Sequence, residues 1–335
     1  MIHLGIIGPG LIWEKTHRDI IASLSGMFSV HAVAARSSHN QDRAREFYPN
    51  AQIYSDAHEL INDPQVEAVV ILTPISLNAP LAQATLEAGK HAIVEKPMAR
   101  SADEAYALAE LAQRSPGVLY ILEQHVHKPL IPVVRGCIDD GVIGDPVSFE
   151  RALHVRIAAD DDQTGGYGST AWRAEPDYPL GNFFDGGIHE IALLHQLFGP
   201  ARAAYARGRS LRDGFGEVDL LSMVLEYDRR IQGVFAHSAS LGTQGNSFVI
   251  HGTRAALRCS DTDVHVIDGA GGESRILPVK GENESVAMWN EVARVLPEHS
   301  FGRYSPAAAV QDIALMEAVG ASLRDARRTV VRGIS

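Results

Sequence analysis

Short β-branched runs alternate with helical segments through the first 125 residues, and this alternation constrains the fold more than any other feature. Strands joined by helical crossovers form a parallel sheet with helices on both faces. In such a sheet ligands bind beyond the carboxyl ends of the strands, so we expect functional side chains just after each strand. The expected strands are residues 2–7, 29–35, 68–73, 91–95 and 118–123, and the expected helices are residues 43–47, 80–88 and 102–114.

The pattern changes after about residue 125 to longer runs of alternating polar and apolar residues, which predict a largely antiparallel sheet. Helices expected near residues 185–197, 284–296 and 307–323 would cover one face of that sheet. The length of 335 residues also favours two domains. We therefore predict an α/β fold with a doubly wound parallel sheet in residues 1–124 and an α+β domain in residues 125–335.

Charge and cysteine content disfavour several classes of function. The chain has 41 acidic and 30 basic residues, a net charge of −11, and no basic stripe, so we expect no binding to nucleic acid or membranes. Cys137 and Cys259 are its only cysteines, which agrees with a reducing compartment. The amino-terminal run from Ile2 to Ile7 lacks the features of a signal peptide, and no apolar stretch reaches membrane-spanning length. We therefore expect a cytoplasmic protein.

Gly8-Pro9-Gly10 follows the first expected strand and precedes a helical segment. In this context glycines let backbone N–H groups, here including those of Leu11 and Ile12, approach the pyrophosphate of a dinucleotide. The third glycine of the GxGxxG motif is absent, because Trp13 stands there, and we expect its ring to force the helix away from the strand or to swing outward. The alternative is a plain tight turn between strand and helix.

The second expected strand ends in Ala35-Arg36-Ser37 and lacks the acidic residue that normally holds the ribose 2′-hydroxyl. A carboxylate would repel a 2′-phosphate, whereas Arg36 can pair with it and Ser37 can donate a hydrogen bond to it. This pattern favours NADP over NAD as the cofactor. In the alternative interpretation Arg36 stacks on the adenine or faces solvent.

Three further motifs carry a family resemblance: Thr73-Pro74, Ala88-Gly89-Lys90-His91 leading to Glu95-Lys96-Pro97, and Asp185-Gly186-Gly187-Ile188-His189. With them the chain resembles the glucose-fructose oxidoreductase / inositol dehydrogenase / MocA family over nearly its whole length. The resemblance implies an N-terminal Rossmann domain and a C-terminal domain with an open-faced sheet. It also implies oxidation or reduction of a carbinol carbon of a sugar or cyclitol, and a homodimer or homotetramer formed through that sheet.

The resemblance also assigns roles to individual residues. Lys96 takes the place of the family's lysine, which lies beside the nicotinamide and contacts the reacting oxygen. His189 takes the place of the acid/base histidine, and Asp185 that of the aspartate that binds or orients the substrate. The expected cofactor contacts around Lys96 are Thr73, Pro74, Asn78, Glu95 and Pro97, although Asn78 stands where the family often has histidine.

These residue types suit hydride transfer. A lysine can donate a hydrogen bond to a developing negative oxygen, and a histidine with an ordinary pKa of about 6.5 can take and return a proton. Asp185 and His189 are four residues apart, which places both on one face of a helix. His125 and Trp172 are expected to line the substrate cleft. Tyr167 is a further candidate there, since its ring and that of Trp172 would either stack on a sugar or pack under the loop.

His125 and His127 form an HxH pair that could bind zinc with Asp185 and His189, but no further ligand motif accompanies them and we expect no metal. The leading hypothesis is an NAD(P)-dependent dehydrogenase or reductase that acts on a sugar, cyclitol or related polyol. Two alternatives remain. One is a glycosidase that retains its nicotinamide and acts without net redox change, and the other is a non-catalytic NADP-binding regulator.

Overall fold

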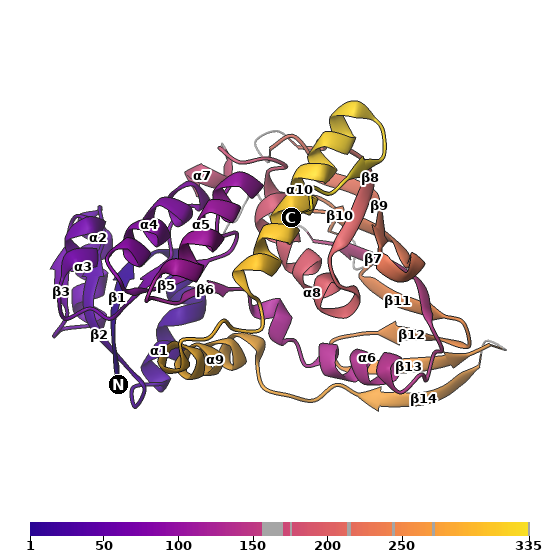
Figure 1. The fold of residues 1–335 in the computed structure, drawn as a ribbon, viewed down its shortest axis with the longest axis horizontal. Coiled ribbons are helices and arrows are strands. Elements are labelled where there is room, and N and C mark those ends of the chain that lie inside the picture. Colours follow the sequence, from indigo (N-terminus) through magenta and orange to yellow (C-terminus); the bar gives the residue numbers. More distant parts are fainter. Residues whose placement is uncertain (156–169, 175, 213–215, 243–244, 270–271, 334–335) are drawn as a thin grey trace. The chain divides into compact units, whose positions relative to one another are not determined.

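The computed structural model describes residues 1–155, 170–174, 176–212, 216–242, 245–269 and 272–333. The chain divides into two compact units, each built on one β-sheet (Figure 1). The first unit comprises Met1–Gln124 and Ser285–Val310, and the second comprises His125–Glu284 and Gln311–Ser335. A C-terminal segment therefore belongs to the N-terminal unit.

The first unit contains a six-stranded sheet in the order β3-β2-β1-β4-β5-β6, in which all paired strands are parallel. This confirms the predicted Rossmann-type sheet and adds the short strand β3, which the sequence pattern did not reveal. The strand order reverses between β1 and β4, where a ligand crevice is expected. The strands are β1 Ile2–Ile7, β2 Phe28–Ala34, β3 Gln52–Tyr54, β4 Ala68–Ile71, β5 His91–Glu95 and β6 Leu119–Leu122.

Helices lie on both faces of this sheet. On one face Gly5 of β1 packs against Leu60 of α3, and α4 contacts α3, α5 and the strands β4 and β5. The opposite face carries Leu4 and Ile6, which share a core cluster with Ile21 of α1. The helices are α1 Arg18–Ser23, preceded by the π-helical segment Trp13–His17, α2 Ser38–Phe47, α3 Ala57–Asn62, α4 Ile75–Glu87 and α5 Ala102–Arg114.

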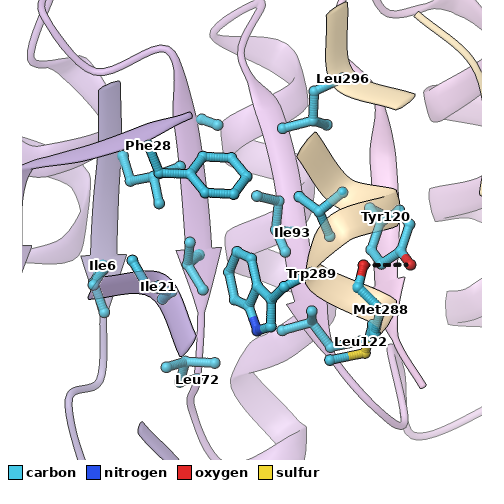
Figure 2. Packing of buried hydrophobic residues seen from close by; sticks show 14 of the residues in the cluster. Ile6, Ile21, Phe28, Leu72, Ile93, Tyr120, Leu122, Met288, Trp289 and Leu296 are labelled. Atoms are coloured by element: carbon cyan, nitrogen blue, oxygen red, sulfur yellow. Dashed lines mark hydrogen bonds between the residues drawn. The ribbon is translucent and has the colours of Figure 1, made fainter. Parts of the chain in front are cut away.

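Helix α9 (Glu284–Glu298) corrects one expectation, because it packs in the first unit and not on the second sheet. Its residues Met288 and Trp289 are completely buried in the core cluster that contains Phe28 and Tyr120 (Figure 2). The ring of Trp289 meets Phe28 edge to face at 5.7 Å between centroids. The helix has an apolar stripe that requires a core, but the period of such a stripe does not say which sheet it covers.

The second unit contains a nine-stranded sheet in the order β14-β13-β12-β11-β7-β10-β9-β8-β15. The pair β7–β10 is parallel and the other paired strands are antiparallel, so the predicted largely antiparallel sheet is confirmed. The strands are β7 Pro146–His154, β8 Ala201–Arg209, β9 Leu220–Tyr227, β10 Gln232–Ser238, β11 Ser247–Gly252, β12 Ala255–Cys259, β13 Asp263–Asp268, β14 Glu273–Pro278 and β15 Thr329–Val330.

One face of the second sheet carries helices. Phe149 of β7 stacks on Phe198 at the end of α8, with ring centroids 5.0 Å apart. His195 of α8 pairs in turn with Asp312 of α10. The helices are α6 Leu130–Asp139, α7 Ala171–Ala174, α8 Ile188–Phe198, preceded by the π-helical segment Phe183–Gly187, and α10 Pro306–Asp325.

The opposite face of this sheet is exposed along one transverse row. The strand register aligns Tyr205 with Val224, Val224 with Val234, and Val234 with Glu150. Val234 is 50% exposed, and Ile276 at the far end of the same row is 57% exposed. Large apolar side chains on an open sheet face are typical of a surface that another molecule covers.

Among the helices of the described residues, none is long and apolar enough to span a bilayer. Cys137 and Cys259 are both buried, and neither forms a disulfide. Burial raises the pKa of both thiols, that of Cys259 to about 12.

Candidate functional site

The loop after β1 has the backbone that a phosphate cradle requires. Gly8 has a φ of +81°, and a Cβ at this position would lie 2.7 Å from the main-chain oxygen of Leu72, so only glycine fits. Gly10 differs, because its nearest potential Cβ contact is 3.9 Å away. Packing within the protein therefore does not demand a glycine at residue 10, whereas close approach of a ligand would.

The helix that follows is uncapped at its start. Ile12 stands at the N-cap of the π-helical segment, and its apolar side chain forms no capping hydrogen bond. First-turn N–H groups such as those around Leu11 have no partner within a helix. The geometry fits the binding of an anionic group by backbone N–H donors.

Trp13 does not swing outward, contrary to one of the two expectations for it. Its ring is 1% exposed and meets Phe47 of α2 edge to face at 5.7 Å. Its Nε1 donates to the hydroxyl of Tyr48 over 3.4 Å. The bulky ring is accommodated in a π-helical segment that packs toward α2, where aromatic partners replace the close contact that a glycine would allow.

The end of β2 presents a cation. Arg36 is exposed, and it forms no hydrogen bond or ion pair with any residue in the described part of the chain. The neighbouring Ser37 caps α2, since its Oγ accepts a hydrogen bond from the N–H of Asn40 over 3.2 Å. The Ser37 hydroxyl can still donate its own proton, because a hydroxyl both accepts and donates.

Asn78 joins the turns that follow β4 and β5. Its side chain is fully buried, and Nδ2 donates to the main-chain oxygens of Glu95 and Pro97 over 3.0 and 2.9 Å. Its Oδ1 accepts a hydrogen bond from the hydroxyl of Thr73 over 3.0 Å. Thr73, Asn78, Glu95 and Pro97 are thus brought together around Lys96, with Pro74 at the start of α4. The predicted strand-end cluster is present, and Asn78 supports its backbone from within the protein.

Glu95 is a buried acidic residue in this cluster. Its Oε1 lies 2.7 Å from Nε2 of His17, and its Oε2 accepts a hydrogen bond from the N–H of Lys96 over 3.0 Å. His17 was not among the predicted site residues. Nothing in the sequence links it to a glutamate 78 residues further along the chain.

In the second unit Asp185 lies within the π-helical segment before α8 and is 6% exposed. Nε of Arg173 donates to Oδ2 of Asp185 over 2.7 Å. The same guanidinium lies 4.0 Å from the ring centroid of Trp172, so the two predicted residues Trp172 and Asp185 share one cation. Tyr167 lies outside the described residues.

Gly187 allows the π-helical segment before α8 to pack closely on the second sheet. A Cβ at Gly187 would lie 2.4 Å from the ring of Phe183, so the phenyl ring occupies the space that the missing side chain leaves. Phe183 packs in turn on His237 of β10, with ring centroids 5.1 Å apart. Burial lowers the pKa of His237 to about 4, which keeps this imidazole neutral at physiological pH.

His189 is the second residue of α8 and lies beside His125, with ring centroids 4.6 Å apart. Glu190, which follows His189 in the sequence, is 1% exposed. Its Oε1 is 3.6 Å from Nδ1 of His125, and its Oε2 accepts a hydrogen bond from Nε of Arg151 over 2.7 Å. Burial opposes ionisation of Glu190, but the adjacent His125 imidazole and the charge and hydrogen bond of Arg151 outweigh it and hold the pKa of this carboxyl well below its usual range.

The second unit therefore brings together the predicted pair His125 and His189, and it adds Arg151, Arg173 and Glu190. Lys96 lies in the first unit, whereas Asp185 and His189 lie in the second. Arg173 stands next to Trp172 in a segment that the sequence already indicated. The sequence did not identify Glu190 or Arg151 as site residues, because a charged residue beside a motif or on a strand is usually solvated.

Each of the two units contains a region that matches a known protein family. Residues 2–122 match the model of the GFO/IDH/MocA family described as "Oxidoreductase family, NAD-binding Rossmann fold". Residues 133–258 match the model of the GFO/IDH/MocA C-terminal domain.

Individual proteins that are similar to this chain are also oxidoreductases. The chain is 31% identical to a dTDP-3,4-didehydro-2,6-dideoxy-α-D-glucose 3-reductase of Streptomyces violaceoruber, over 78% of this chain and 77% of that protein. It is 25% identical to the scyllo-inositol 2-dehydrogenase (NADP⁺) IolW of Bacillus subtilis, over 75% of this chain and 66% of that protein. The crystal structure of an oxidoreductase from Thermotoga maritima superimposes with a TM-score of 0.90 at 26% identity and covers 98% of both chains. The chain therefore belongs to the Gfo/Idh/MocA family of oxidoreductases, whose N-terminal domain is an NAD-binding Rossmann fold.

Proposed function

We propose that this oxidoreductase transfers hydride between a nicotinamide cofactor and a carbinol or ketone carbon of a sugar, cyclitol or related polyol. The observation that carries the proposal is the cluster of predicted residues beyond the carboxyl ends of parallel strands. Gly8 follows β1, Arg36 follows β2, Thr73 follows β4 and Lys96 follows β5, and these strands share one direction. The names of the Bacillus and Streptomyces relatives, an inositol dehydrogenase and a deoxysugar reductase, support the class of substrate.

The cofactor that we propose is NADP, with NAD as the alternative. The uncapped helix start after Gly10 would hold the pyrophosphate, and Ala35, Arg36 and Ser37 would hold the ribose of the adenosine half. An exposed guanidinium without a partner among the described residues suits a 2′-phosphate, and no carboxylate stands at the end of β2 to repel it. The Bacillus relative is named for NADP⁺, which supports the preference, while the family description names NAD.

The bound nicotinamide would supply or accept the hydride. The Lys96 ammonium would donate a hydrogen bond to the reacting oxygen and stabilise negative charge that develops on it. His189 would take the hydroxyl proton in the oxidation and return it in the reduction. Asp185, held by Arg173, would orient the substrate hydroxyls, and His125 and Trp172 would line the remainder of the substrate cleft.

We further propose that two copies of the chain associate through the open face of the second sheet, as a homodimer or as half of a homotetramer. The exposed row around Tyr205, Val234 and Ile276 crosses most of the sheet, and a second copy of the same row would cover it. We also propose a cytoplasmic location, in agreement with two reduced and buried cysteines.

Turnover with site variants tests this function. Purified protein is supplied with NADP⁺ or NADPH and a panel of inositols, sugars and ketoses, and reduced nicotinamide is followed by its absorbance. We expect Lys96→Met to lower kcat about 100-fold or more and His189→Ala to lower it by about 10²–10⁴. Lys280→Met and His58→Ala are matched controls, because both side chains are exposed, and they should leave kcat unchanged.

The outcomes separate the alternatives. Near wild-type turnover in both Lys96→Met and His189→Ala would overturn the assignment of the site. Consumption of a glycoside without net change in reduced nicotinamide would favour a redox-neutral glycosidase. Saturable cofactor binding with no turnover across the whole panel would favour a regulator.

A further inference from the structure

His17 links three segments of the first unit that are far apart in the sequence. It is the last residue of the π-helical segment after the phosphate loop, and it is 1% exposed. Its Nε2 lies 2.7 Å from Oε1 of Glu95 at the end of β5. Its Nδ1 lies 3.0 Å from Nε1 of Trp289 on α9, a residue 272 positions away. Both ring nitrogens are therefore engaged.

The partners of His17 fix its tautomer. An indole N–H can only donate a hydrogen bond, so Nδ1 of His17 must accept and carries no proton. The ring proton then resides on Nε2 and is donated to the Glu95 carboxylate. Trp289 thus selects the tautomer in which His17 binds Glu95.

The chain of hydrogen bonds continues to Lys96. The second oxygen of Glu95, Oε2, accepts a hydrogen bond from the main-chain N–H of Lys96 over 3.0 Å. Asn78 binds the main-chain oxygens on either side of that lysine. Strand β5 ends at Glu95, so side chains replace the sheet hydrogen bonds that would otherwise hold the lysine backbone.

We propose that His17 and Trp289 are positioning residues that set the backbone of Lys96 through Glu95. The inference rests on the proposed role of Lys96 in the reaction. Neither residue needs to touch substrate, because a displacement of about 1 Å in a reacting group can cost about 100-fold in rate. The C-terminal helix α9 thereby contributes to the site that the N-terminal sheet presents.

A purely structural role is the competing explanation, since Trp289 also packs edge to face on Phe28 and on the ring of His17. Conservative variants separate the two roles. Trp289→Phe retains an aromatic ring but removes the N–H donor together with the volume of the fused five-membered ring, so its melting temperature is measured beside its kcat. His17→Gln extends an amide N–H to the place of Nε2, whereas the shorter side chain of His17→Asn falls short of Glu95.

We expect His17→Asn to lower kcat about 10- to 100-fold with little change in the KM for NADPH, and His17→Gln to restore kcat to within about 5-fold of the wild type. Trp289→Phe should lower kcat by less than His17→Asn, because the tautomer is then no longer selected but can still form. Equal loss of kcat in His17→Gln and His17→Asn would overturn the proposal, as would a loss that follows melting temperature alone.

A double-mutant cycle with Lys96→Met makes the test specific. If His17 acts through the lysine, His17→Asn should leave the residual kcat of the Lys96→Met variant unchanged, whereas an independent effect would multiply the two losses. Full activity of Lys96→Met alone refutes the proposed function. A slow Lys96→Met variant whose residual kcat falls further with His17→Asn refutes only the positioning role.

A measurement without cofactor or substrate completes the test. The histidine ring ¹⁵N spectrum of labelled protein, with His17 identified by its loss in His17→Asn, should show protonation at Nε2 alone. In Trp289→Phe the same signals should shift toward a mixture of the two tautomers. Protonation at Nδ1 in the wild type would contradict the hydrogen-bond chain.

Discussion

Nε of Arg173 donates to Oδ2 of Asp185 over 2.7 Å, and both side chains are largely buried. Removing one partner of a buried ion pair leaves the other charge poorly compensated, at a cost of about 3 kcal/mol. We therefore expect Arg173→Met to lower the melting temperature of the protein clearly, and the double variant with Asp185→Asn to lose less than the sum of the two single changes. Arg202→Met is the control, because the pair Arg202–Asp228 is more than half exposed and should contribute almost nothing.

Asn78 offers a second test of the turn around Lys96. Asn78→Asp keeps the shape of the side chain but replaces the donor that binds the main-chain oxygens of Glu95 and Pro97 with a carboxylate oxygen. A buried carboxylate facing two carbonyl oxygens is repelled, so we expect a lower melting temperature and a lower kcat. Asn50→Asp makes the same change at an exposed position and should alter neither quantity. Wild-type behaviour of Asn78→Asp in both measurements would show that the turn does not depend on this amide.

Arg36 is expected to decide between the two nicotinamide cofactors. A hydrogen bond to a charged group is worth about 1.5–3 kcal/mol, so Arg36→Gln should raise the KM for NADPH about 10- to 100-fold. The KM for NADH should stay the same, because NADH has no 2′-phosphate. Steady-state kinetics with both cofactors, and with the exposed control Arg332→Gln, measure this. Equal changes for both cofactors in Arg36→Gln would remove the argument for NADP.

Much of this arrangement could be predicted from the sequence because it is local. The apolar runs that became β1, β2, β4, β5 and β6 are buried strands, and the motif residues after them cluster as the parallel topology requires. Glu95, Lys96 and Pro97 could be located by their motif alone. A strand as short as β3, with three residues, is too brief for a periodic pattern to reveal.

The remainder depends on contacts between distant segments. Trp289 and His17 form a hydrogen bond although they are 272 residues apart in the sequence. Neither the apolar stripe of α9 nor the position of His17 in the sequence identifies the residue that each contacts. The same holds for Glu190, whose buried charge is compensated by Arg151 on a strand 39 residues earlier. Only tertiary packing decides which of several equally plausible surfaces such side chains meet.

The oligomer that we propose can be broken without altering the core. Val234 is 50% exposed in the middle of the exposed row, so Val234→Lys should place a charge in the contact and yield monomers where the wild type is dimeric. Val147→Lys is the matched control, because Val147 is 41% exposed but alternates onto the opposite face of the sheet. Light scattering coupled to gel filtration gives the mass of each variant. A wild-type monomer at micromolar concentration would contradict the proposal.

The pair of His195 and Asp312 predicts how stability changes with pH. Nδ1 of His195 lies 2.6 Å from Oδ1 of Asp312. Burial alone would lower the pKa of His195, but the charge and hydrogen bond of Asp312 outweigh burial and raise that pKa above 6.5. A group whose pKa is raised on folding stabilises the protein fully below its unfolded pKa, and this stability is lost as pH rises through the folded pKa. The contribution of the pair should therefore be present at pH 6 and decline above it.

Replacing His195 with glutamine removes the titration while retaining a polar side chain at the same position. Melting temperatures measured across this pH range should fall more steeply with rising pH for the wild type than for His195→Gln. The difference between the two proteins should be largest at the acidic end and should shrink toward the alkaline end. If the two curves of melting temperature against pH were parallel, the pKa of His195 would be the same in the folded and unfolded protein. Asp312 would then not stabilise the protonated form of His195.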